Sequence, residues 1–244
     1  MVDSYIEANG TSFYGPAPLH HTLLSGSRRT GVTLQTLHPK HFDNGRILAQ
    51  TPQPGWEHGC HTVEALSSQL GQQGADMLVA CIKNRLYLYG SSQSDDSPQA
   101  MELEDPTREN DTLRPRHAPK ITKKDGLIAW TTMTAAEILR RHEIIGPLWN
   151  TVGARRLIWS GGFELALQIP ASELPVGQPV VRGLDQCVYI RTCDDQVLRV
   201  HEIKFEGDVQ YEPLKAATKA GMHDPQVGGD GPLFQFPISS ERPS

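Results

Sequence analysis

The first third of the chain alternates short apolar segments with one long periodic segment. Residues 32–37 (VTLQTL) and Ile47-Leu48-Ala49 are short aliphatic runs, which predict two strands. Residues 61–88 carry apolar side chains at helical spacing and predict a helix, broken near Gly71 and Gly74. Strands followed by a helix indicate an α/β domain. Because a complete α/β sheet has about five or six strands, we expect this part to be the end of a larger domain.

The second half of the chain shows a different pattern. Thr134-Ala-Ala-Glu137 is a capping box that predicts the start of a helix, and Gly146-Pro147 predicts its end. Alternating apolar and polar positions at residues 163–169 predict a strand, and residues 188–200 predict a hairpin that turns at Asp194-Asp195-Gln196. Short strands separated by glycine-containing turns are typical of a small β-barrel. The predicted fold class is therefore α/β plus β.

Composition narrows the classes of protein. Of the 244 residues, 38% are hydrophobic, which is enough for a core and excludes wholesale disorder. No apolar run approaches the ~20 residues of a membrane helix. Residues 1–14 have neither the basic nor the apolar region of a signal or transit peptide. The net charge of −5 argues against indiscriminate binding to nucleic acid.

The distribution of charge gives a different indication. Residues 93–111 contain seven acidic side chains and one basic one, whereas residues 112–156 contain nine basic and three acidic ones. The basic segment is either a surface for a polyanion or a solvated surface that pairs with the acidic run. The acidic run also predicts a linker, because its beginning, from Gly90 to Pro98, is rich in turn-forming residues. We place a domain boundary between about Gly90 and His117.

Candidate chemistry is sparse when it is judged from spacing alone. His38-Pro-Lys-His41 and His58-Gly-Cys60-His61 superficially resemble metal ligands, but no spaced partner pair accompanies them. We interpret them as turn or surface histidines and predict no metal. Asp43 lies at a strand-to-turn junction before Gly45, where spacing favours a carboxylate that stabilises the turn. Phosphate-binding glycine loops and the nucleophile elbow are absent from the sequence.

Several blocks, in order, carry a family resemblance. Gly15-Pro-Ala-Pro-Leu-His, then Thr30-Gly-Val-Thr-Leu-Gln, then Phe42-Asp-Asn-Gly resemble the second half of the folate-dependent formyltransferase domain. Residues 118–130 (APKITKKDGLIAW) resemble the block that opens the C-terminal domain of methionyl-tRNA formyltransferases, where Ala129 departs from the usual Asp. The resemblance covers about residues 15–221 and is strongest for mitochondrial members of fungal type.

The resemblance implies a domain organisation. Residues 1–14 would be an unrelated segment, and residues 15–90 the C-terminal part of a Rossmann-like formyltransferase domain. Residues 91–117 would form the acidic linker. Residues 118–221 would form an OB-like β-barrel domain that binds tRNA, and residues 222–244 a disordered tail.

The resemblance also implies an activity. Family members transfer a formyl group from 10-formyltetrahydrofolate, without a metal, to the amine of initiator Met-tRNA. It further implies a mitochondrial location. Separately, we expect a monomer and no membrane partner. The family uses an Asn, a His and an Asp, and Asp43 matches the Asp, which would hold the His and an ordered water. In the family the C-terminal domain grips tRNA phosphates, which agrees with the basic segment and implies these tRNA-binding residues: Arg114, Arg116, Lys120, Lys123, Lys124, Arg140 and Arg141.

The other two catalytic positions differ from the family. Counting back from Gly15, Ser4 stands where the family has Asn, and Ile6 stands where it has His. We therefore expect no substantial formyltransferase activity from the chain as written. The change of pattern between Tyr14 and Gly15 is typical of a truncated or misjoined reading of a longer gene. The alternative is a non-catalytic protein that keeps the barrel and the basic segment to bind tRNA.

Overall fold

The computed structural model describes residues 2–4, 13–37, 40, 45–52, 54–88, 116–182, 187–208 and 216. The chain divides into two compact units, Met1–Ile121 and Thr122–Ser244. Asp43, most of the predicted linker and the predicted tail at residues 222–244 lie outside the described residues. Within the described residues, the helices are too short or too polar to cross a membrane.

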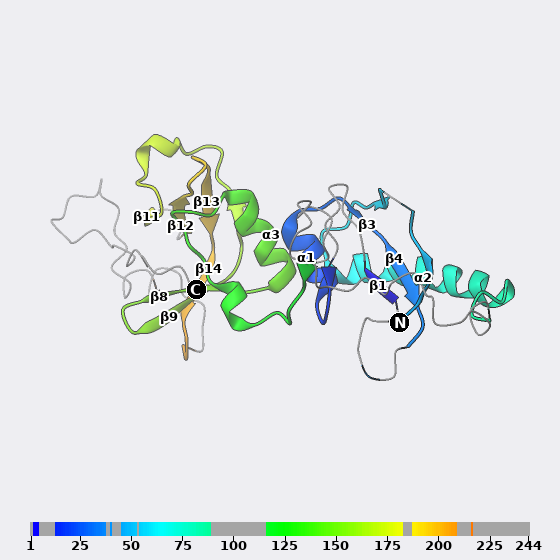
Figure 1. Cartoon of the computed structure of the whole chain (residues 1–244). Coiled ribbons are helices and arrows are strands. Elements are labelled where there is room, and N and C mark those ends of the chain that lie inside the picture. The colour runs from blue at the N-terminus through cyan, green and yellow to red at the C-terminus, as the bar shows by residue number, and fades with distance from the viewer. Residues whose placement is uncertain are drawn as a thin grey trace, which may run out of the picture. The chain divides into compact units, whose positions relative to one another are not determined.

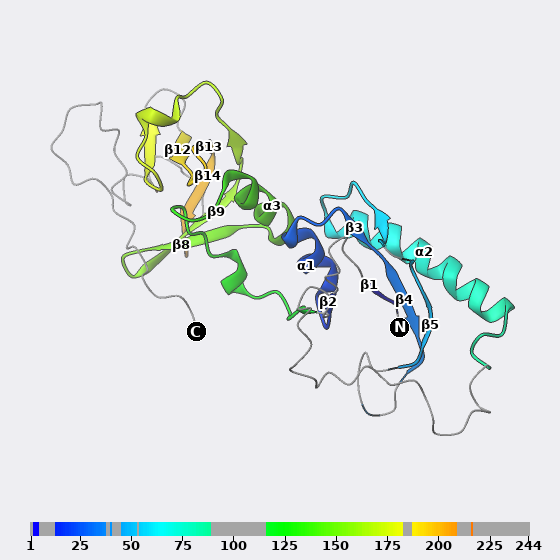
Figure 2. The same cartoon turned by 45° about the horizontal axis from the view of Figure 1, so that its top comes forward.

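Unit 1 is built around a small antiparallel sheet with a long helix beside it (Figures 1 and 2). The strand order is β1, β4, β5, with bounds Val2–Ser4, Val32–Gln35 and Ile47–Gln50. A second antiparallel pair joins β3 (Arg29–Thr30) to β6 (Trp56–Glu57). The two strands predicted from residues 32–37 and 47–49 are confirmed by β4 and β5.

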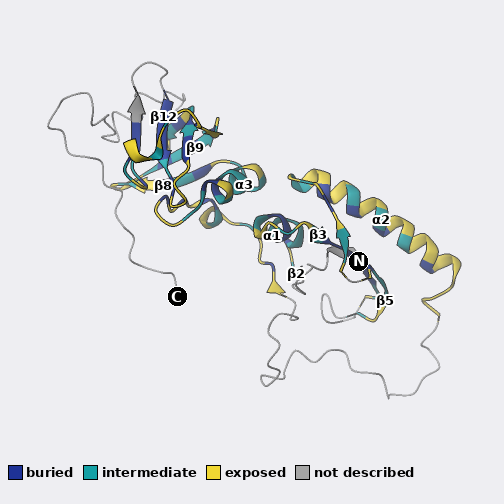
Figure 3. Cartoon of the chain, turned by 90° about the horizontal axis from the view of Figure 1, so that it is seen from above, coloured by how far each residue is buried: buried dark blue, intermediate teal, exposed yellow. Residues whose placement is uncertain are grey.

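Helix α2 spans Val63–Lys83 without interruption, so the predicted break near Gly71 and Gly74 is wrong. It begins at Thr62, whose side chain accepts a hydrogen bond from the backbone N–H of Ala65 at 3.2 Å. Its buried residues share one face, and most of the remaining surface is exposed (Figure 3): Leu66, Leu70, Gly74 and Cys81. A glycine inside a helix costs about 1 kcal/mol. Burial of a leucine contributes about 1.5–3 kcal/mol, which explains why the helix continues.

Helix α1 (Pro18–Ser25) begins with a proline in its first turn, where the fixed φ of proline suits the helix. It ends at Gly26, whose φ of 77° is the left-handed cap that glycine adopts without strain. Strand β2 (Phe13–Tyr14) precedes the helix and pairs in parallel with β7 (Arg116–His117). This pairing brings the end of the predicted linker back to the start of the resembling region.

Unit 2 consists of helix α3 and two antiparallel sheets. The four-stranded sheet has the order β10, β13, β12, β11, with bounds Glu164–Leu165, Val197–Val200, Cys187–Arg191 and Pro179–Arg182. The three-stranded sheet has the order β14, β9, β8, with bounds Glu202–Phe205, Arg155–Gly161 and Leu148–Val152. Strands β12 and β13 confirm the predicted hairpin.

The strand predicted over residues 163–169 is wrong beyond Leu165. The N–H of Ile169 donates to the carbonyl of Ala166 at 3.1 Å, which turns the chain toward the short 3-10 helix η3 (Ala171–Glu173). Leu167 is 82% exposed. The alternation at these residues therefore does not mark a buried face.

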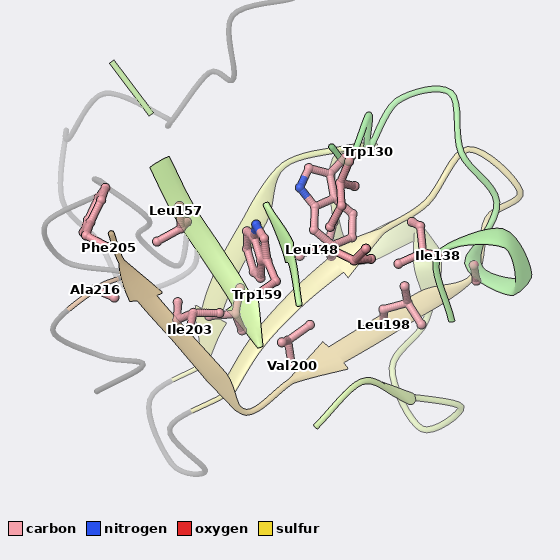
Figure 4. Packing of buried hydrophobic residues seen from close by; sticks show 14 residues of the cluster. Trp130, Ile138, Leu148, Leu157, Trp159, Leu198, Val200, Ile203, Phe205 and Ala216 are labelled. Atoms are coloured by element: carbon pink, nitrogen blue, oxygen red, sulfur yellow. The ribbon is translucent and has the colours of Figure 1, made fainter. Parts of the chain in front are cut away.

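One hydrophobic core holds the two sheets and α3 together (Figure 4). Trp130 and Trp159 meet edge to face there, with ring centroids 5.0 Å apart. On β12, Val188 and Ile190 face this core, whereas Tyr189 packs in a second cluster. Among the described strands no ladder joins the two sheets, and the closed barrel expected from the sequence is not confirmed.

Helix α3 spans Ala135–Ile145, which confirms the predicted start and end. The Thr134 hydroxyl accepts from the N–H of Glu137 at 3.2 Å, and Gly146 ends the helix. A second cap comes from the β12–β13 hairpin. There the carboxylate of Asp194 accepts from the N–H of Ala135 at 3.1 Å and from the hydroxyl of Thr192 at 2.6 Å. Desolvation by itself would raise the pKa of Asp194, but the hydrogen bonds from Thr192 and Ala135 help to outweigh it, so the pKa is lowered.

Candidate functional site

Two of the family-like blocks meet in unit 1. Beyond the β2–β7 pair, the N–H of Ala118 donates to the carbonyl of Tyr14 at 2.7 Å, and the N–H of Ala17 donates to the carbonyl of Ala118 at 3.2 Å. The ring of His21 is hydrogen-bonded to the carbonyl of Pro119 at 3.0 Å. The blocks that begin at Gly15 and Ala118 are thus neighbours in space, although about a hundred residues separate them in sequence.

The conformation at this junction requires glycine at position 15. Gly15 has a φ of 112°, which L-residues rarely adopt. A Cβ there would lie 3.0 Å from the carbonyl oxygen of Ala118 and 3.1 Å from the ring of His117. The backbone of one block therefore approaches the other too closely for a side chain.

An open hollow of about 420 Å³ lies beside this junction. It is lined by residues 15–20 and by four side chains or backbones from β4 and α2: Val32, Ser67, Leu70 and Gly71. His20 and Ser67 supply its polar side chains. The lining offers one imidazole and one hydroxyl, and no carboxylate or amide side chain.

The structure explains the glycine of the Asp43-Asn44-Gly45 block. Thr36 and Arg46 form two hydrogen bonds of 2.9 Å, one between backbone groups and one to the Thr36 hydroxyl. A Cβ at Gly45 would overlap the carbonyl of Thr36. This close approach accounts for Gly45, while Asp43 itself lies outside the described residues.

The predicted tRNA-binding residues fall in both units. Arg116 and Lys120 are exposed in unit 1, and Arg114 lies outside the described residues. Unit 2 carries the rest, two on the 3-10 helix η2 (Lys123–Gly126) and two on α3: Lys123, Lys124, Arg140 and Arg141. The structure thus places four of the seven on neighbouring elements of unit 2.

The turn η2 presents two lysines to solvent. The carboxylate of Asp125 accepts from the N–H of Thr122 at 2.7 Å and from its hydroxyl at 2.9 Å, which closes the turn. Lys123 and Lys124 are exposed and form no ion pair with another described residue. Both ammonium groups are available to an anion outside the chain.

Arg140 and Arg141 are adjacent in sequence but differ in their contacts. One Nη of Arg141 donates to the carbonyl of Asp125 at 2.8 Å, and the other pairs with Glu137 at 3.4 Å. Arg140 forms no ion pair with another described residue. Arg141 therefore links α3 to η2, while Arg140 keeps its charge free.

Two further arginines of the basic segment are also engaged within unit 2. Arg155 lies 4.6 Å from the centroid of Phe205 and pairs with Asp208 at 3.5 Å. Arg156 lies 4.5 Å from the ring centroid of Trp149 and pairs with Glu206 at 3.4 Å. Because the acidic partners lie far along the chain, no local signal in the sequence identifies these contacts.

The histidines of unit 1 differ in burial. His58 is 8% exposed, so its interpretation as a surface residue is wrong. Burial lowers the pKa of its imidazole, and the nearby backbone of Cys60 and Ser27 opposes this shift only in part. Among those residues, no group of three or more His, Cys, Asp or Glu side chains could hold a metal ion. His38 and His41 lie outside them.

The fold resembles that of a solved structure. HypX from Aquifex aeolicus, solved in complex with tetrahydrofolic acid, superposes with a TM-score of 0.50. It is 14% identical to this chain, and the match covers 91% of this chain and 36% of HypX. At this identity the likeness shows the fold alone. No family model matches the chain.

Relatives with a similar amino-acid sequence point to one class of enzyme. The mitochondrial methionyl-tRNA formyltransferase of Saccharomyces cerevisiae is 35% identical over 55% of this chain and 34% of its own length. The human enzyme is 35% identical over 69% of this chain and 40% of its own length. The rat enzyme is 32% identical over 77% of this chain and 44% of its own length. These matches confirm the resemblance to methionyl-tRNA formyltransferases. The chain spans less than half the length of these relatives.

Proposed function

We propose that this chain carries the tRNA-binding part, and the second part of the catalytic domain, of a methionyl-tRNA formyltransferase. Its reaction is formyl transfer from 10-formyltetrahydrofolate to the amine of initiator Met-tRNA in translation initiation. The observation that carries the proposal is the similarity to mitochondrial methionyl-tRNA formyltransferases over 55–77% of the chain. The names of these relatives also support a mitochondrial location.

A folate donor is supported by the tetrahydrofolic acid bound to HypX. The attack of the tRNA amine on a formyl carbon creates an oxyanion, which hydrogen-bond donors stabilise without a metal. The hollow beside Gly15 offers one imidazole and one hydroxyl. Because these are few polar side chains for a pteridine ring, we do not assign the folate contacts to this hollow.

The partner is initiator Met-tRNA, bound through its phosphates. We assign the contact to the predicted residues Arg114, Arg116, Lys120, Lys123, Lys124, Arg140 and Arg141. Support comes from the exposure of Lys123 and Lys124 and from the absence of ion pairs at both within the described residues. Phosphate binding needs such free cationic side chains.

We propose the domain organisation that the resemblance implies. Residues 15–90 form the catalytic part, residues 91–117 a linker, and residues 118–221 an OB-like domain whose two sheets share one core. Residues 1–14 and 222–244 lie outside the region of resemblance, although residues 2–4 and 13–14 form strands β1 and β2 of unit 1. We propose a monomer without a membrane partner.

Replacement of the basic residues tests the tRNA proposal. The variant K120Q/K123Q/K124Q/R140Q of the full chain removes four charges without touching the described ion pairs. Each lost phosphate contact lowers the salt dependence of log K by about 0.7–0.9. We expect weaker binding to initiator tRNA and a slope that falls by about 3. Unchanged binding would remove the basic segment from the proposal.

A second candidate function is tRNA binding without catalysis. It is favoured by Ser4 and Ile6, which stand where the resembling family has Asn and His. Loss of a general base and of an oxyanion donor lowers the rate by about 10² or more each. We expect the full chain to bind initiator Met-tRNA but not to formylate it. Formyl transfer that disappears in D43N would rule out this second candidate.

A further inference from the structure

The turn η2, which carries Lys123 and Lys124, is held in place through its backbone carbonyls, and the lysine side chains take no part in these contacts. The indole N–H of Trp149, on β8, donates to the carbonyl of Lys123 at 2.6 Å. The carbonyl of Trp149 accepts from the N–H of Ile128 at 2.9 Å, just beyond the other end of the turn. From α3, Arg141 donates to the carbonyl of Asp125 at 2.8 Å. Two external contacts thus hold the four-residue turn, and a third holds the chain just beyond it.

The indole of Trp149 is itself held in place. The guanidinium of Arg156 lies 4.5 Å from its ring centroid, and Glu206 pairs with that guanidinium at 3.4 Å. On the side of the turn, a Cβ at Gly126 would lie 3.4 Å from Cδ1 of Trp149, so the turn packs closely on the ring. The ring therefore has little freedom to move away from the carbonyl of Lys123.

We propose that Trp149 is a positioning residue for tRNA binding. Its indole N–H fixes the backbone of η2 so that the side chains of Lys123 and Lys124 meet tRNA phosphates together. A turn that is ordered before binding loses less conformational entropy when the phosphates arrive. The inference rests on the proposed function, because it needs the two lysines to contact tRNA.

A double-mutant cycle on the full chain tests this role. W149F keeps an aromatic ring under Arg156 and removes the indole N–H together with part of the ring. We expect W149F to bind fluorescently labelled initiator tRNA about fivefold more weakly, the effect of one hydrogen bond. K123Q/K124Q weakens binding further and lowers the salt slope by about 1.5. In that lysine-free background W149F should have no further effect, because it acts through the lysines.

Matched variants separate this role from a loss of stability. W56F removes the indole N–H of a partly exposed tryptophan in unit 1, and K83Q removes an exposed charge from α2. Neither should change tRNA affinity. If K123Q/K124Q binds as the wild type does, the proposed lysine contact is wrong. If that variant loses affinity but W149F does not, or if the W149F effect persists without the lysines, the positioning role is wrong.

Discussion

Replacement of Gly15 by alanine tests the junction between the two family-like blocks. At a φ of 112° an L-residue costs about 1–3 kcal/mol. The added Cβ would also lie 3.0 Å from the carbonyl oxygen of Ala118, which the N–H of Ala17 uses as its acceptor at 3.2 Å. Displacement of that oxygen costs about 1 kcal/mol more. We expect G15A to destabilise the junction by about 2–4 kcal/mol.

Amide hydrogen exchange measured by mass spectrometry reports this loss locally. A change of about 2–4 kcal/mol accelerates exchange from the opened junction about 30- to 1000-fold. The acceleration should appear in peptides covering residues 13–25 and 116–121, and not in peptides covering β8 and β9. G71A is the matched control, since Gly71 is exposed on α2 and a Cβ there meets nothing within 4 Å. It should stabilise the helix by about 0.5–1 kcal/mol. Equal exchange in G15A and the wild type would refute the account of the junction.

Three further predictions concern stability. Because burial lowers the pKa of His58, the unfolded chain binds a proton more readily than the folded one, so unit 1 should lose stability as the pH falls below about 6.5. H58Q should flatten that part of the pH–stability curve. An identical curve for H58Q and the wild type would contradict the assignment. The pKa of Asp194 is lowered, so its contribution to the stability of unit 2 is present above the ordinary aspartate pKa and is lost as the pH falls through the folded pKa. D194N should therefore reduce the acid sensitivity of unit 2 in urea titrations. An unchanged loss of stability at acid pH would contradict this prediction. T134A removes the side-chain cap of α3 and should lower the free energy of unfolding by about 1 kcal/mol in the same titrations. T132A is the control, because the Thr132 hydroxyl donates only to a carbonyl at 3.4 Å, and it should change the free energy of unfolding less.

The elements with local signals could be predicted from the sequence. Helix α3 has its capping residue Thr134 and its stop at Gly146, and the β12–β13 hairpin has its turn at Asp194-Asp195-Gln196. Strands β8 and β9 were not predicted. On β9 the buried residues Leu157 and Trp159 alternate with partly exposed ones that include Ile158, so the apolar pattern is blurred. Their pairing becomes visible only when the core they share with β14 is formed.

In the candidate site, too, the sequence indicates the residues but not the contacts between them. The blocks at Gly15 and Ala118 could be recognised in the sequence, but their contact depends on the β2–β7 pair, which joins segments distant along the chain. The sequence predicts the same tRNA-binding role for Arg140 and Arg141. Only the positions of Asp125 and Glu137 distinguish a free charge from one that links two elements.

The salt dependence of tRNA binding by the full chain tests the central claim most directly. Among the described residues, five predicted cations form no ion pair: Arg116, Lys120, Lys123, Lys124 and Arg140. If each contacts one phosphate, log K for initiator tRNA should fall with log salt concentration with a slope of about −3.5 to −4.5. A slope near zero, or no binding at low salt, would contradict the claim that this net-negative chain binds tRNA through its basic segment.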